Sequence, residues 1–122
     1  MKKLLILSFL IISLLASSQS KVDSLLQLCK NAPEIKKVDL YLQLSLNTRG
    51  DSAKSNAYSR MAHQLAVKKN QISLQAKALY YLGETLYNST NYQSAISAYQ
   101  KALSVYITTK DTVNLVNCHK LI

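Results

Sequence analysis

Glycine and proline are scarce in this chain, with two glycines and one proline among 122 residues. A β-sandwich or β-barrel needs a turn signal about every 8–12 residues, so the shortage of turn-forming residues excludes those folds. Tryptophan is absent. Hydrophobic residues make up 48% of the chain, which is enough to pack the core of one small domain. The sequence therefore predicts an all-α fold.

The chain also lacks the motifs that accompany catalysis and metal binding. It contains no glycine-rich phosphate loop, no HExxH-type metal motif and no nucleophile elbow. Its two cysteines and two histidines are not spaced as metal ligands. We therefore assign no catalytic residue, no metal site and no cofactor, and we predict that the chain is not an enzyme.

Acidic residues are few: the chain has six of them and fifteen lysines and arginines, which gives a formal net charge of +9. The basic excess is spread along the chain rather than clustered. A nucleic-acid footprint usually shows a basic stripe with stacking aromatics. We therefore expect no specific nucleic-acid partner, only a weak general attraction to anionic polymers.

The first twenty residues have the layout of a secretory signal peptide. A basic start is followed by an apolar run at 4–16 and then by small polar residues. The apolar run is shorter than the roughly 20 residues of a spanning helix. Cleavage after Ser18 or Ser20 would suit the small-x-small requirement, and the alternative is an uncleaved N-terminal anchor. We expect a bacterial protein exported to the periplasm or the extracellular space, with 1–20 as signal peptide and 21–122 as the helical domain.

A shift of forty residues aligns the rest of the chain with itself. Leu42 then falls on Leu82, and Ala62 falls on Ala102. The alignment divides the domain into four segments: a short helix at 22–30, a repeat at 36–69, a second repeat at 76–109 and an incomplete repeat at 111–122, which we expect to be truncated.

The second repeat contains two apolar stripes with helical spacing, separated by the polar residues 88–91. This pattern predicts two antiparallel helices joined by a short loop. Gly83 lies inside the first helix, where glycine costs about 1 kcal/mol relative to alanine. We expect a packing reason for it: small residues that let the two backbones approach, with tyrosine rings alongside.

The same residues resemble the tetratricopeptide repeat. The motif reads Leu79-x-x-Leu82-Gly83-x-x-Leu86, followed by Tyr92, Ala95, Tyr99 and Ala102. The sequence departs from the family pattern at three positions: Leu79, where tryptophan is usual, Leu86, where the first aromatic residue is usual, and Ile107, where proline is common. The resemblance implies antiparallel helix hairpins, in a long variant of about forty residues, stacked as a right-handed α-solenoid. It also implies a protein or peptide partner.

The concave side of such a solenoid is built from the first helix of each hairpin. The resemblance and the forty-residue register place five candidate binding residues there: Lys37, Tyr80, Glu84, Tyr87 and Asn88. Tyrosine anchors tend to dominate binding energy. The alternative is that the two tyrosines only pack against neighbouring helices.

The sequence stops inside the third repeat on an apolar stripe that includes Leu121 and Ile122. We therefore expect the N-terminal sensory or interaction part of a longer signalling protein, similar to the exported part of bacterial sensor kinases and regulators. A membrane contact is then expected only through the missing C-terminal part. One alternative is a repeat segment that positions an envelope enzyme domain absent from this chain. Another is a small secreted basic protein that binds anionic polymer.

Overall fold

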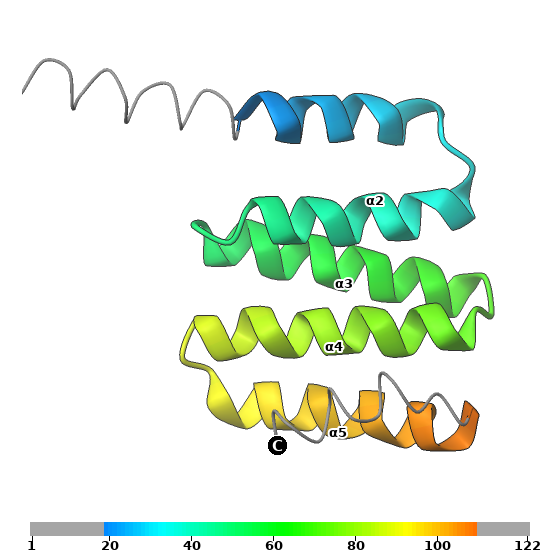
Figure 1. Ribbon diagram of the computed structural model, residues 1–122, viewed down its shortest axis with the longest axis vertical. Coiled ribbons are helices and arrows are strands. Elements are labelled where there is room, and N and C mark those ends of the chain that lie inside the picture. Colours follow the sequence, from blue (N-terminus) through cyan, green and yellow to red (C-terminus); the bar gives the residue numbers. More distant parts are fainter. Residues whose placement is uncertain (1–18, 110–122) are drawn as a thin grey trace, which may run out of the picture.

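The computed structural model describes residues 19–109. Every element in this range is an α-helix, and the range contains no strand. A first helix at 19–31 is followed by α2 (Glu34–Asn47), α3 (Ser52–Lys68), α4 (Ile72–Asn88) and α5 (Tyr92–Thr109). Consecutive helices run antiparallel and form a stack (Figure 1). The all-α fold of helix hairpins predicted from the sequence is therefore confirmed.

The helix bounds differ in places from those expected. The first helix includes residues 19 and 20, which the sequence pattern assigned to the signal peptide. The helix α2 begins directly after Pro33, whose ring fixes φ at −57° and starts the helix without a side-chain cap. The apolar run at 4–16 and the incomplete repeat at 111–122 lie outside the described residues. No helix within 19–109 has the length and hydropathy that a membrane span requires.

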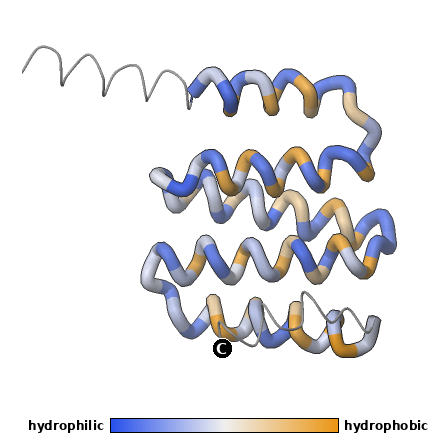
Figure 2. Tube along the Cα trace, in the orientation of Figure 1, coloured by the Kyte–Doolittle hydropathy of each residue, from blue (hydrophilic) through white to orange (hydrophobic). Residues whose placement is uncertain are grey.

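Apolar residues recur along each helix between polar ones, rather than filling any helix (Figure 2). The helices α2, α3 and α4 share one core, because α2 contacts both of the others. Its buried members are Val38, Leu42, Ala62, Ala66 and Ala78. The first helix buries Val22, Leu25 and Cys29 against Leu44 of α2.

The α3–α4 and α4–α5 connections are the same tight turn. The Gln71 N–H donates to the carbonyl of Ala66 at 3.0 Å, and the Asn91 N–H donates to that of Leu86 at 2.9 Å. The residue before each donor is left-handed, with φ of 55° at Asn70 and 64° at Thr90. This Schellman arrangement satisfies the last carbonyls of each helix and reverses the chain within three residues.

Replacing Thr90 with glycine should stabilise the protein. A left-handed backbone costs an L-residue about 1–2 kcal/mol, and a β-branched side chain is among the least suited to it. We expect the free energy of unfolding to rise by about 1 kcal/mol for Thr90→Gly. The gain for Asn70→Gly should be smaller, because asparagine tolerates this conformation. Urea denaturation of both variants checks the order, and equal gains would contradict it.

Gly83 lies beneath the ring of Tyr99. A Cβ atom added to this glycine would stand 2.6 Å from both Cδ1 and Cε1 of Tyr99, closer than real contacts allow. Tyr99 is itself only 2% exposed, so its ring cannot move into solvent. The packing reason expected for Gly83 is thus found. The ring rests on the glycine itself, where the sequence had suggested rings alongside two closely approaching backbones.

The first hairpin, α2–α3, has a buried hydroxyl network in the corresponding place. The hydroxyl of Ser45 donates to the carbonyl of Ser55 at 2.9 Å, and the hydroxyl of Ser55 donates to the carbonyl of Ser45 at 2.8 Å. Ser45 has a single proton, so Ser59 donates to the Ser45 Oγ across 2.6 Å. All three side chains are buried, and every hydroxyl proton has an acceptor.

The α2–α3 connection is one residue longer than the α4–α5 connection, running over 48–51 instead of 89–91. The forty-residue register therefore holds for α3 and α5 but is wrong for α2 and α4. Ser45 contacts α3 in the place where Leu86 contacts α5. These two residues are forty-one positions apart in the sequence, not forty. Leu42 accordingly corresponds to Gly83, not to Leu82. One residue along a helix is a rotation of about 100°, so this offset decides which side chains face outward.

Candidate functional site

A hollow of about 350 Å³ lies along the exposed side of α4. It is open to solvent and combines aromatic with charged side chains. Its lining comes from the end of α2 and the residues after it, from α4 and from α5: Leu46, Arg49, Lys77, Tyr80, Tyr81, Glu84 and Tyr106. We call this hollow the α4 groove. Two of the five residues predicted from the sequence, Tyr80 and Glu84, lie in it.

Tyr80 has two roles in this groove. Its ring centroid lies 5.8 Å from that of Tyr81, edge to face, and 5.9 Å from that of the buried Tyr99. Such ring pairs hold a tyrosine in one orientation. Both Tyr80 and Tyr81 are half-buried. Tyr80 therefore packs against neighbouring rings and still exposes part of its own ring, so packing and groove lining are not alternatives for this residue.

Charges of both signs border the aromatic wall. The Nη2 of Arg49 lies 3.5 Å from Oε2 of Glu84, and the Nζ of Lys77 lies 3.5 Å from Oδ1 of Asp39. Each pair joins α4 to the α2 side of the groove. Pairs as exposed as these contribute roughly 0–1 kcal/mol to stability. Because little is lost when such pairs separate, their charged groups are available to a ligand.

Tyr87 and Asn88 lie outside the groove lining, at the C-terminal end of α4. Tyr87 is 55% exposed, and its ring centroid lies 5.1 Å from that of Tyr92 on α5. Asn88 is exposed as well. These two residues border the turn into α5, so the structure does not bring them together with Tyr80 and Glu84 in one hollow.

Lys37 lines a different hollow, between α2 and α3, where Met61 and Lys68 are among its neighbours. The physical reason is the one-residue offset of α2, which puts Lys36 rather than Lys37 in the place that corresponds to Lys77. Glu34 also lines this hollow. The hydrogen bond from Lys69, together with the positive charges of Lys68 and Lys69, holds the pKa of Glu34 below its usual value.

The five candidates from the sequence do not include the other lining residues, which are Leu46, Arg49, Lys77, Tyr81 and Tyr106. Arg49 lies in a connection, and a shift of forty gives no reason to expect it beside α4. The only available signal was the extra residue at 48–51, which changes the register of α2.

As for metal sites, residues 19–109 contain no group of three His, Cys, Asp or Glu side chains that could hold an ion.

The α4–α5 hairpin has a counterpart among known protein families. Residues 76–108 match the model of the tetratricopeptide repeat. This segment is a tetratricopeptide repeat. The match begins within α4 and ends one residue before the end of α5. No curated protein and no solved structure matches the chain significantly.

The tetratricopeptide repeat is in general a non-catalytic scaffold for protein–protein interaction. In the repeat found here, the motif residues Leu82, Gly83 and Leu86 are buried against α5, whereas Tyr92 is half-exposed. The repeat therefore uses most of its motif to build the hairpin. In the α4 groove, Lys77 is exposed, and Tyr80, Tyr81 and Glu84 are partly exposed.

Proposed function

We propose that this protein is an exported scaffold that binds a peptide segment of a protein partner in the α4 groove. The observation that carries the proposal is the groove itself, which lies on a tetratricopeptide repeat and holds fixed tyrosine rings beside loosely paired charges. The scaffold serves as the N-terminal sensory or interaction part of a longer signalling protein. The signal-peptide pattern at 1–20 supports export to the periplasm or the extracellular space of a bacterium.

The chemistry of the groove suits a peptide better than a small apolar ligand. Aromatic side chains that are already ordered lose little conformational entropy on binding, and they tend to anchor interfaces. Arg49 and Lys77 can pair with a ligand carboxylate, and Glu84 can accept from a ligand amine or amide. A short peptide supplies apolar and charged groups of both kinds along one chain.

Reversing the charge of Lys77 should weaken peptide binding without unfolding the protein. We suggest selecting peptides of about twelve residues from a random library on the purified full chain, and then measuring their affinities for variants. Lys77→Glu should reduce the affinity at least tenfold, because it opposes the ligand charge and repels Asp39. The matched control is Lys101→Glu, which reverses an exposed lysine on α5 outside the groove and should leave the affinity unchanged.

Two results would overturn the proposal. The first is that no peptide sequence is enriched in the selection. The second is that the selected peptides bind Lys77→Glu as tightly as the unaltered chain, with NMR amide shifts that fall outside α4. Far-UV circular dichroism of each variant verifies that the helices are intact.

A further inference from the structure

The charged groups that line the α4 groove are unequal in number. The lining holds two cations, Arg49 and Lys77, and one acid, Glu84. The side chains of the two cations are 53% and 47% exposed, whereas that of Glu84 is 27% exposed. A ligand that enters the groove therefore meets an excess of positive charge. The whole chain adds to this field, because its formal net charge is +9.

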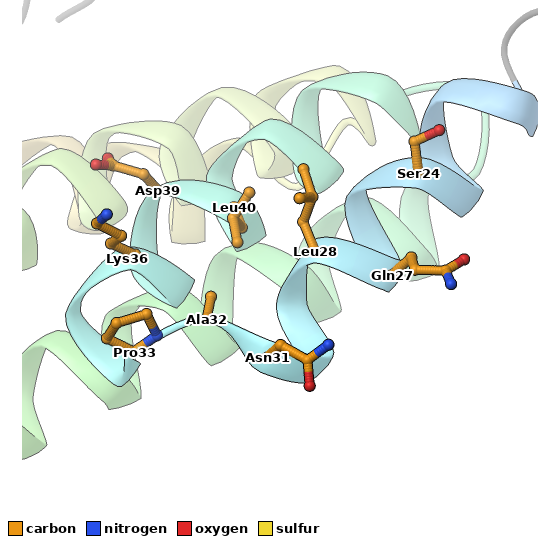
Figure 3. A pocket seen from close by; sticks show the side chains of 9 residues that line it. All are labelled: Ser24, Gln27, Leu28, Asn31, Ala32, Pro33, Lys36, Asp39 and Leu40. Atoms are coloured by element: carbon orange, nitrogen blue, oxygen red, sulfur yellow. The ribbon is translucent and has the colours of Figure 1, made fainter.

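The acid that pairs with Lys77 lies outside the α4 groove. Asp39 contacts the Nζ of Lys77 at 3.5 Å, yet it is not part of the groove lining. Figure 3 shows Asp39 and Lys36 on α2, at the border of another hollow between the first helix and α2. Lys36 lies one turn before Asp39 on the same helix, so the two side chains are neighbours. Lys77 can therefore turn towards a ligand while Asp39 keeps a cation nearby.

Arg49 can bind a ligand carboxylate while it keeps its contact with Glu84. Its Nη2 lies 3.5 Å from Oε2 of Glu84, and a guanidinium carries five N–H donors in a planar fork. Other donors of the fork can form a bidentate pair with a second carboxylate. A ligand amine at Glu84, by contrast, must compete with the guanidinium that already lies there. The ion pair therefore favours an anionic ligand over a cationic one.

We infer that the α4 groove selects acidic segments of its partner, which place one side-chain carboxylate on Lys77 and another on Arg49. An apolar side chain of the segment lies between them, against the tyrosine rings. This inference rests on the proposed function, since it names the chemistry of the segment bound in the same groove. Lys77 and Glu84, which marks the Arg49 end, are about 10.5 Å apart along the α4 axis. About three residues of extended chain span that distance.

Two peptide libraries test this inference on the purified full chain. Both contain peptides of about twelve residues with blocked termini and the same uncharged positions. One library has aspartate and glutamate at its charged positions, and the other has lysine and arginine. Selection should enrich peptides from the acidic library only. Fluorescence anisotropy of the selected peptides should show an affinity that falls as the salt concentration rises, and NMR amide shifts should map to α4 and residues 46–49.

The two internal acids compete with such a ligand, because each holds one cation of the groove in the free protein. Asp39→Asn and Glu84→Gln should therefore each tighten binding of the acidic peptides by about twofold to fivefold, as expected for the loss of an exposed ion pair. The matched control is Asp23→Asn, which removes an exposed acid of the first helix outside the groove. It changes the net charge by the same amount and should leave the affinity unchanged.

The outcomes separate this inference from the proposed function. Basic peptides that bind in the α4 groove, or unchanged affinities for both Asp39→Asn and Glu84→Gln, would overturn the inference and leave the proposed function standing. Equal gains for Asp23→Asn and Asp39→Asn would do the same, because the net charge of the chain would then attract the peptides. Failure of both libraries, or amide shifts outside α4, would overturn both. Circular dichroism of the variants, whose altered side chains are all at least partly exposed, verifies their folding.

Discussion

Replacing Gly83 with leucine should disrupt the α4–α5 hairpin and lower the free energy of unfolding by about 3 kcal/mol or more, the upper end of the usual cost of overpacking. Even the first added carbon would stand 2.6 Å from two ring atoms of Tyr99, which is buried and cannot swing away. In a domain of this size, that loss lowers the melting temperature by roughly 12–24 °C. Thermal unfolding followed by circular dichroism measures it.

Gly50 provides the matched control, because it is the other glycine of the chain. A Cβ atom there would meet nothing within 4 Å, and no glycine within residues 19–109 has a positive φ. Gly50→Ala should therefore leave stability unchanged or raise it by about 0.4–1 kcal/mol, through the smaller entropy of the unfolded chain. An unaltered melting midpoint for Gly83→Leu would contradict the tight packing of Tyr99 on the glycine.

Removing one hydroxyl of the serine network should destabilise the protein more than removing all three. In Ser45→Ala, the Ser59 hydroxyl is left buried without its acceptor, and the Ser55 carbonyl loses a donor. A buried polar group without a partner costs about 1–3 kcal/mol, so we expect a loss in that range. Equilibrium urea denaturation measures it, with the slope of the transition as a test of two-state unfolding.

The triple variant Ser45→Ala, Ser55→Ala, Ser59→Ala is the decisive comparison. It removes the unpaired hydroxyls together with their partners, and the backbone carbonyls retain helical or turn hydrogen bonds. We expect its stability to lie within about 1 kcal/mol of the unaltered chain and above that of Ser45→Ala. Three additive losses would show that the hydroxyls stabilise the hairpin independently, without forming a network.

Local sequence patterns were sufficient to predict the helices and one repeat. Stripes spaced by three and four residues identify a helix face whatever lies opposite, and the motif around Gly83 identified the segment that the family comparison matched. Asp51 is well placed to cap α3, and its side chain does accept from the N–H of Lys54 at 3.2 Å. Asn91 occupies the same position before α5, yet within the described residues no side-chain bond joins it to the first turn of α5.

The candidate site was predicted only in part. Tyr80 and Glu84 share the α4 groove because both lie on one face of a single helix, which is a local property. Lys37 was placed with them by a register that the longer connection at 48–51 interrupts. The groove's other wall, with Arg49 and Leu46, comes from a part of the chain more than thirty residues away, and no local pattern specifies that approach.

Composition and periodicity alone predicted an all-α protein of amphipathic helices, because the shortage of turn residues excludes sandwiches and barrels and apolar residues spaced by three and four mark helix faces. Tertiary structure decided the rest. A single extra residue in one connection shifts the register of α2 by one residue, which is about 100° around the helix axis. Lys36 rather than Lys37 therefore corresponds to Lys77 of the α4 groove. Helix formation depends on neighbours within one turn, whereas a groove depends on which faces of separate helices meet.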